Sequence, residues 1–353
     1  MSPSLSDLQT ALSGHVEPLT QKPLADFVSL EQESLVVTAG YPTVSMSSQL
    51  MAVVSEALAS SGIDIPGEVR QQIPAVQPAN TPSRIDGVKN IIAVASGKGG
   101  VGKSTTSVNL ALALAYEGAR VGILDADIYG PSLPQMLGTG SLRPEVIADN
   151  VIAPLEAYGV QMVSMGSLVT ENTPMVWRGP MVSGALKQLL TSARWQDLDY
   201  LIIDMPPGTG DIQLTLSQSV PVRSSVVVTT PQDIALLDAK KGIEMFRKVN
   251  IPVAGVVENM STHICSQCGH SEAIFGEHGG ERLAEEFMVP LLGQLPLKMS
   301  IREQVDAGKP PVVSDPESAE SQEYRNIALK LAASLWSQSL EGQAGPEISF
   351  SDD

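Results

Sequence analysis

The sequence predicts an α/β fold in which a mostly parallel, doubly wound sheet has helices on both faces. From Asn90 onward, short apolar and β-branched runs alternate with helix-forming stretches, which is typical of strands buried on both sides. The predicted strands cover residues 90–95, 121–124, 160–164, 200–203, 225–229, 253–257 and 291–295. A glycine-rich loop follows the first strand and carboxylates follow two others, so polar groups gather at the carboxyl ends of the strands.

The length of 353 residues leaves room for a large domain and a smaller one. We expect a small N-terminal α/β domain whose predicted elements are helices over 7–12 and 47–60 and strands over 25–30 and 34–39. Three prolines between Gln72 and Ser83 indicate a linker between the two domains. The predicted boundaries are 1–72 for the small domain, 73–84 for the linker, 85–340 for the large domain and 341–353 for an acidic, flexible tail.

The composition has a marked excess of acidic residues. The chain contains 22 Lys and Arg against 39 Asp and Glu, a formal net charge of −17. This charge disfavours sequence-independent binding to nucleic acid or to anionic membranes, so neither is expected as a partner. The N-terminus has no basic segment followed by an apolar core, and no apolar run could span a bilayer, so we expect a soluble, cytoplasmic protein.

The loop from Ser96 to Thr105 reads Ser-Gly-Lys-Gly-Gly-Val-Gly-Lys-Ser-Thr and leads from a predicted strand into a predicted helix over 106–116. This context and the Gly-x4-Gly-Lys-Ser spacing are typical of the phosphate-binding loop of a P-loop NTPase. Glycines let backbone N–H groups approach phosphate oxygens, Lys103 reaches the terminal phosphates and Ser104 offers a hydroxyl to Mg²⁺. The loop residues expected to bind ATP are Gly97, Gly99, Gly100, Val101, Gly102, Lys103, Ser104 and Thr105.

A second lysine, Lys98, stands inside this loop. The segment from Lys98 to Thr105 resembles the deviant Walker A motif of the class that includes ParA, MinD and the nitrogenase iron protein. In that class the extra lysine reaches across a dimer interface to the nucleotide of the partner. The resemblance therefore implies a catalytic role for Lys98 in trans.

Polar side chains follow three of the predicted strands. Asp125 and Asp127 end one strand, and Asp204 begins the segment Asp-Met-Pro-Pro-Gly-Thr-Gly-Asp after another. Carboxylates at such positions hold Mg²⁺ through water or orient the attacking water, and the sequence does not divide these roles between Asp125 and Asp127. Asn259 follows a third strand, and its amide can read an adenine edge or cap the backbone.

The chain has two cysteines, spaced as Cys265-x-x-Cys268. In a chain without an export signal, this spacing indicates a metal or redox site rather than a structural disulfide. An iron–sulfur cluster and tetrahedral zinc both need four ligands, so two thiolates form half a site and imply a partner. Zinc that recruits His263 and His270, and dithiol redox chemistry, are alternatives that these residues leave open.

Taken together, five segments resemble the Mrp/ApbC family of iron–sulfur cluster carriers over roughly residues 85–335. These are Lys98–Thr105, Asp125–Ser132, Trp177–Met181, Asp204–Asp211 and Val257–Cys268. The resemblance implies a homodimeric ATP hydrolase that receives a 4Fe-4S cluster from donors and transfers it to apoproteins. By position it assigns phosphate contact to Lys103, action across the dimer to Lys98, water positioning to Asp127, adenine recognition to Asn259, Mg²⁺ binding to Ser104, Asp125 and Asp204, and cluster ligation to Cys265 and Cys268.

The N-terminal region departs from the family pattern. Family members often carry an Asp-Pro-Glu-Leu-like turn there, which Val16-Glu-Pro-Leu19 resembles only weakly, and the region has no cysteine. We therefore expect a docking or regulatory role for this domain rather than a reactive one.

Two other functions compete with the carrier hypothesis. A positioning ATPase of the ParA/MinD type would need a basic face or a basic C-terminal amphipathic helix, whereas this chain ends in an acidic segment and carries a cysteine pair. An electron donor like the nitrogenase iron protein would have cluster cysteines far apart in sequence. The close spacing of Cys265 and Cys268 instead favours exposed ligands in one loop, from which a cluster can be released.

Overall fold

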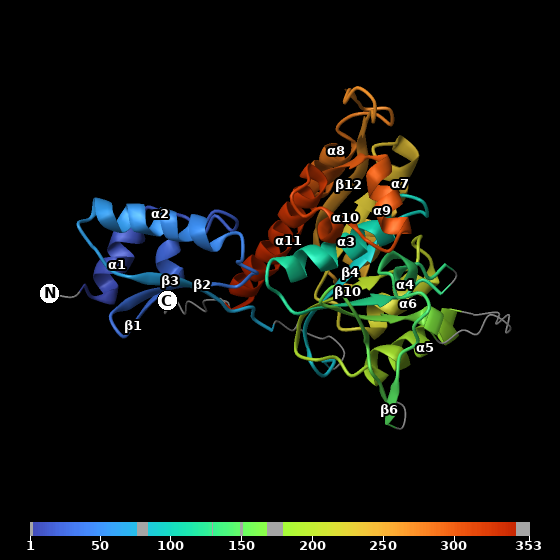
Figure 1. The fold of residues 1–353 in the computed structure, drawn as a ribbon, viewed down its shortest axis with the longest axis horizontal. Helices are drawn as coiled ribbons and strands as arrows, with labels where there is room; N and C mark the ends of the chain where they lie inside the picture. Colours follow the sequence, from blue (N-terminus) through green and yellow to red (C-terminus); the bar gives the residue numbers. More distant parts are fainter. Residues whose placement is uncertain (1–2, 76–83, 129, 149–150, 168–178, 344–353) are drawn as a thin grey trace, which may run out of the picture. The chain divides into compact units, whose positions relative to one another are not determined.

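The computed structural model describes residues 3–75, 84–128, 130–148, 151–167 and 179–343 (Figure 1). Packing divides the chain into two units. Unit 1 comprises residues 1–74 and 329–353, and unit 2 comprises residues 75–328. The helix α11 (Ala319–Gln343) contributes residues to both units.

A nine-stranded sheet forms the centre of unit 2 in the described part of the chain. Its order is β13-β12-β11-β4-β10-β5-β9-β8, and β14 also pairs with β12. The strands are β4 (Val88–Ala95), β5 (Val121–Asp125), β8 (Leu155–Ala157), β9 (Val160–Ser164), β10 (Leu198–Asp204), β11 (Ser224–Thr229), β12 (Val253–Ile264), β13 (Ser271–Glu272) and β14 (Leu291–Leu297). The pairs β8–β9 and β12–β13 are antiparallel and the others are parallel, so the predicted mostly parallel sheet is confirmed.

Helices cover both faces of this sheet. They are α3 (Lys103–Tyr116), α4 (Leu133–Met136), α5 (Gly179–Ser192), α6 (Asp211–Ser219), α7 (Asp233–Lys248), α8 (Gly279–Phe287), α9 (Met299–Asp306) and α10 (Pro311–Ser314). Buried side chains of α5, α7 and α8 join one core with Ile91, Leu201 and Val227. Side chains alternate along a strand, so Ile92 and Ile202 point to the opposite face, where α3 packs against β5 and β10.

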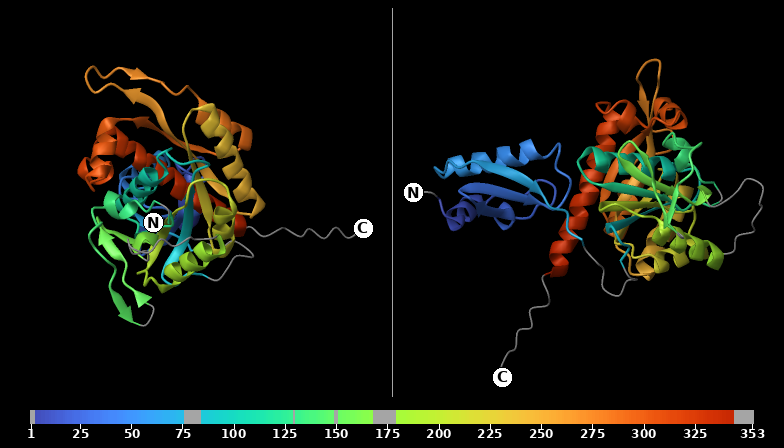
Figure 2. Two further views of the ribbon diagram at one scale, coloured as in Figure 1. Left: turned by 90° about the vertical axis from the view of Figure 1, so that its right-hand side faces the viewer. Right: turned by 60° about the horizontal axis from the view of Figure 1, so that its bottom comes forward.

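The structure contains short strands that the sequence did not predict. β6 (Val146–Ala148) and β7 (Val151–Ile152) form a separate two-stranded antiparallel sheet, and β8 and β13 are added at the margins of the main sheet. These strands have two or three residues each, too few to show a period of alternation. The strand expected over 253–257 also continues to Ile264, and its outer end forms a hairpin with β13 that projects beyond the helices (Figure 2).

Unit 1 contains a three-stranded sheet of β1 (Val28–Glu31), β2 (Ser34–Ala39) and β3 (Gly67–Gln71), with α1 (Leu5–Leu12) and α2 (Ser47–Ser60) packed on it. The strand predicted over 25–30 starts late, because Pro23 is followed by a 3-10 turn over Leu24–Phe27. β3 was not predicted, since its segment has one apolar residue and gains its strand geometry by parallel pairing with β2.

The Glu17 turn, which the sequence singled out, is tied down inside unit 1. Glu17 is buried, and its carboxylate accepts hydrogen bonds from the Tyr41 hydroxyl at 2.6 Å and from the backbone N–H of Thr20 at 2.6 Å. Burial and this carboxylate raise the pKa of Tyr41. The contacts give the turn a structural role in fixing the loop after α1.

The indole of Trp336, from α11, completes the core of unit 1. Its ring centroid lies 4.5 Å from that of Phe27 and 5.6 Å from that of Tyr41. A Cβ at Gly40 would collide with the same indole, so the glycine allows the close approach. The last helix of the described chain is thus part of the packing of the first domain.

We expect Trp336→Ala to lower the free energy of unfolding of unit 1 by about 3–5 kcal/mol, because a large buried ring is removed. Urea unfolding of the full chain, followed by far-ultraviolet circular dichroism, measures the change. Trp336→Phe keeps a ring in the site and serves as the control with a smaller loss. A loss below about 1 kcal/mol for the alanine variant would show that the indole contributes little to unit 1.

Candidate functional site

The loop between β4 and α3 has the backbone geometry of a phosphate-binding loop. Gly100 and Gly102 have φ of +80° and +82°, a conformation that side chains disfavour. Gly102 caps α3 without any side-chain hydrogen bond, so the first N–H groups of the helix point into the loop. The helix dipole adds to the attraction for an anion at this end.

Asn259 holds the far side of this loop. Its Nδ2 donates a hydrogen bond to the Val101 carbonyl at 2.9 Å, and the residue is buried. A Cβ at Gly102 would collide with the same amide nitrogen, so the strand β12 and the loop are in close contact. One side-chain donor is engaged with the loop, while Asn259 also lines an adjoining pocket.

Lys103, Ser104 and Asp204 form one buried polar network. The Lys103 ammonium lies 2.7 Å from Asp204 Oδ1, and the Ser104 hydroxyl donates to Asp204 Oδ2 at 2.7 Å. Ser107, which sequence reasoning missed, donates to Asp204 Oδ1 at 2.6 Å. The sequence could have indicated Ser107, because it follows Lys103 by one helical turn and so lies on the same face of α3. The network brings together a lysine, whose charge suits a phosphate group, and oxygen atoms of the kind that Mg²⁺ prefers.

Asp125 and Asp127 have different surroundings. Asp125 is fully buried and accepts hydrogen bonds from the Ser164 hydroxyl and the Leu133 backbone N–H, both at 3.2 Å. Burial, reinforced by the charge of Asp204 on the neighbouring strand, raises the pKa of Asp125 to about 7. Asp127 is partly exposed and lines the phosphate-binding pocket. Only Asp127 of the two is therefore open to the pocket among the described residues.

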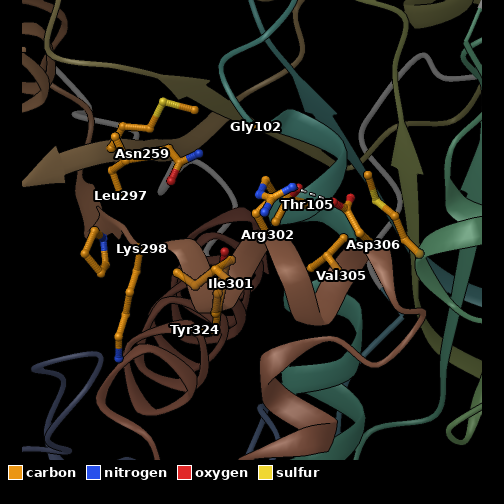
Figure 3. Close-up of a pocket in the computed structure, with 13 residues that line it drawn as sticks. Gly102, Thr105, Asn259, Leu297, Lys298, Ile301, Arg302, Val305, Asp306 and Tyr324 are labelled. Atoms are coloured by element: carbon orange, nitrogen blue, oxygen red, sulfur yellow. Dashed lines mark hydrogen bonds and ion pairs between the residues drawn. The ribbon is translucent and has the colours of Figure 1, made fainter. Parts of the chain in front are cut away.

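Two pockets adjoin at the start of α3. The first, of about 210 Å³, is lined by the phosphate loop, Asp127, Ser132 and Pro207. The second, of about 230 Å³, lies between Asn259 on one side and α9 on the other (Figure 3). Both are lined by Gly102, Thr105 and Met136, so together they form one elongated site. This shape suits a phosphate chain at one end and a nucleoside at the other.

Lys98 lies outside both pockets. Within the described residues its side chain forms no ion pair, and its backbone carbonyl accepts a hydrogen bond from the Ser96 hydroxyl at 2.9 Å. The neighbouring Gly97 packs so closely on α7 that a Cβ there would collide with the backbone of Asp238. Lys98 is therefore part of the phosphate loop, but its side chain does not line either pocket.

The cysteine pair lies at the tip of the β12–β13 hairpin. His263 pairs with Glu272 and Ile264 with Ser271, which leaves the cysteines in the connecting turn. Cys268 is exposed and Cys265 is partly exposed. Backbone N–H groups of Gln267 and Cys268, together with the Cys268 thiol, lower the pKa of Cys265. Such a turn favours thiolate and hence metal ligation.

A tetrahedral metal site at the cysteine pair would need further ligands beside the two thiolates. Among the described residues, no group of three or more His, Cys, Asp and Glu side chains is placed to hold a metal ion. His263 and His270 are thus not grouped with the two cysteines as a preformed four-ligand site in this part of the chain. The cysteine pair by itself supplies two thiolates, which is half of a four-ligand site.

Parts of the predicted motifs lie outside the described residues. These are Tyr129 of the segment 125–132, Trp177 and Arg178 of the segment 177–181, and the side chain of Asp211. Among the described residues, no helix has both the length and the apolar character required to cross a membrane.

Comparison with known proteins agrees with this site. The ParA family profile described as NUBPL iron-transfer P-loop NTPase matches residues 87–332. The "Iron-sulfur cluster carrier protein" of Pseudomonas fragi is 59% identical over 290 residues, which cover 82% of this chain and 98% of that protein. The mouse "Iron-sulfur cluster transfer protein NUBPL" is 49% identical over 289 residues, covering 81% of this chain and 88% of that protein.

A solved nucleotide-binding protein from Archaeoglobus fulgidus, in complex with ADP, has the same fold. It superposes with a TM-score of 0.58 and 34% identity, and the match covers 67% of this chain and 91% of that chain. The family profile spans the strand β4, the phosphate loop, Asp204 and the cysteine hairpin. The chain therefore belongs to the ParA-type family of NUBPL iron-transfer P-loop NTPases.

Proposed function

We propose that this protein is an ATP-hydrolysing carrier that binds a 4Fe-4S cluster between two copies of the chain and transfers it from donors to apoproteins. The observation that carries the proposal is that one strand, β12, supplies Asn259 to the nucleotide pocket and ends in the Cys265–Cys268 turn. The names of the relatives support a cluster as the cargo. The net charge of −17 disfavours nucleic acid or membrane as partners.

ATP binding and hydrolysis are supported by the polar network at the start of α3. The phosphate loop and Lys103 would bind the β- and γ-phosphates, with Lys103 moving from Asp204 to the developing charge on the phosphates. The Ser104 hydroxyl and the carboxylate of Asp204 fit a hard cation, and Mg²⁺ bound there supplies charge neutralisation on the phosphates. Asp127, which lines the phosphate pocket, would orient the attacking water, while buried Asp125 would support this shell from behind.

Cluster binding and release are supported by the position of the cysteines at the tip of the β12–β13 hairpin. Two thiolates on an exposed turn bind only half of a four-iron cluster, and a symmetric dimer would bring two such turns together on its axis. An exposed position lets an apoprotein thiolate reach the cluster and exchange ligands with it. The cargo is thus held by few ligands and at the surface, as release requires.

Anaerobic reconstitution with iron and sulfide tests the whole proposal. We expect absorption and Mössbauer spectra of a 4Fe-4S cluster, about two irons per chain, a dimer by sedimentation, and activation of an apo-acceptor enzyme. Tight zinc without sulfide, or about four irons on a monomer, would contradict the shared cluster.

Lys98→Ala is expected to slow ATP hydrolysis by about tenfold or more while ATP still binds, because the lysine would act on the phosphates of the partner chain. Heterodimers of Lys98→Ala with Asp127→Ala place both lesions on one composite site and leave the other intact. Equal mixing should therefore restore up to about a quarter of the wild-type rate, since half the dimers carry one intact site. No recovery would show that Lys98 acts within its own chain.

A further inference from the structure

The face of α9 that lines the nucleoside pocket is built with a regular spacing. Lys298, Ile301, Arg302, Val305 and Asp306 all line it, at the i, i+3, i+4, i+7 and i+8 positions of one helical face. Ile301 and Val305 are 8% and 3% exposed and supply an apolar wall. Lys298 is held by Glu320 at 2.8 Å, so its charge is already neutralised. Arg302 and Asp306 are the polar groups that this face offers to a ligand.

The direction of α9 shows which part of a nucleotide these two residues would face. The helix begins just after β14, whose Leu295 pairs with Asn259. Beyond its end, a Cβ at Gly308 would lie 2.8 Å from the Cα of Gly138, close to the end of α4. α9 therefore runs from the Asn259 end of the pocket to the α4 end, where Met136 lines both pockets.

Asp306, the last residue of α9, accordingly lies toward the junction with the phosphate pocket, and Arg302 lies one helical turn before it on the face that lines the pocket (Figure 3). Their side chains form an ion pair at 3.3 Å, and both are largely exposed, with 66% and 59% of the side chain accessible. Exposed pairs of this kind contribute little to stability, so the carboxylate is available to a ligand at small cost.

Of the three parts of a nucleotide, only the ribose suits a contact with the carboxylate of Asp306. A carboxylate repels phosphate, and the base is expected at the Asn259 end of the pocket, whereas Asp306 lies at the opposite end of α9. Between base and phosphate lies the ribose, whose hydroxyl groups are hydrogen-bond donors that an ionised carboxylate accepts. We propose that Asp306 recognises the ribose hydroxyls, that Arg302 positions its carboxylate, and that α9 thereby makes the site selective for ribonucleotides. The proposal rests on the nucleotide-binding function proposed above.

Calorimetric binding of ATP, 2′-deoxyATP and 3′-deoxyATP to the full chain tests this selectivity. We expect wild-type protein to bind ATP about tenfold more tightly than at least one deoxynucleotide, because a hydrogen bond to a charged group is lost. In Asp306→Ala this preference should fall to near one. Glu303→Ala is the matched control, because Glu303 also pairs with Arg302, at 3.6 Å, but does not line the pocket.

The outcomes separate this inference from the proposed function. Equal affinities of the wild type for all three nucleotides, a preference that survives in Asp306→Ala, or an equal loss of all three affinities in that variant would overturn the role of Asp306. Loss of the preference in Glu303→Ala as well would assign the effect to the charge of α9 and also overturn it. Failure of wild-type protein to bind any of the nucleotides would instead refute the nucleotide site itself.

Discussion

Replacing Lys103 by alanine is expected to reduce ATP hydrolysis by about 10²- to 10³-fold, since the phosphates lose a positioned positive charge that stabilises the transition state. The structure adds a reason to expect a large effect. Lys103 is 6% exposed and lies at the end of a hydrogen-bonded network with Asp204 and Ser104, so its ammonium is held in a defined place. Steady-state phosphate release measures the rate.

Two controls distinguish a specific role of Lys103 from the loss of any lysine and from a loss of folding. Lys309→Ala removes an exposed lysine beyond α9 and should leave the rate unchanged. Lys103→Ala also leaves the carboxylate of Asp204 buried without its cation, which can destabilise the fold, so circular dichroism must show that the variant is folded. Lys103→Gln is a second variant, whose side chain can still donate a hydrogen bond to Asp204. Hydrolysis near the wild-type rate in either folded Lys103 variant would refute the phosphate-loop assignment.

Replacing Cys265 or Cys268 by alanine is expected to abolish cluster binding. The iron and sulfide content after anaerobic reconstitution should fall from about two of each per chain to near zero, because each change removes two of the four thiolates from a symmetric site. ATP binding should be unaffected, since the hairpin tip is a separate segment from the phosphate loop.

Ser266→Ala, in the same turn, is the matched control and should keep its cluster. A cluster retained at full content in either cysteine variant would show that the ligands lie elsewhere in the chain. Loss of ATP binding together with the cluster would show instead that the hairpin supports the nucleotide pocket.

The parts of the fold that the sequence predicted are those governed by local patterns. The seven apolar runs became strands, because a strand buried on both faces needs apolar residues at every position, as in Leu201–Ile203. The phosphate loop could be predicted since its glycines, Lys103 and Ser104 lie close together in one short segment of the sequence. The cysteine turn could be predicted as well, because its two cysteines lie three residues apart.

Features made by tertiary contact could not be predicted in this way. Ser107 is an ordinary helix residue until β10 brings Asp204 to it. Arg302 and Asp306 line the pocket only because α9 packs beside it. From the sequence alone, an acidic and a basic residue four positions apart on a helix predict an ion pair on a solvent-exposed face. β3 and the packing of Trp336 in unit 1 likewise depend on partners distant in sequence.

The packing of Trp336 has a consequence for the order in which the protein matures during synthesis. A ribosome adds about 5–20 residues per second, so Trp336 is made roughly 15–60 s after Tyr41, its neighbour in the core of unit 1. Throughout this interval the surface around Phe27 and Gly40 has no indole to cover it. Unit 1 therefore completes its core only after the residues of unit 2 have been made, and a chain truncated before α11 would leave the apolar surface around Phe27 uncovered.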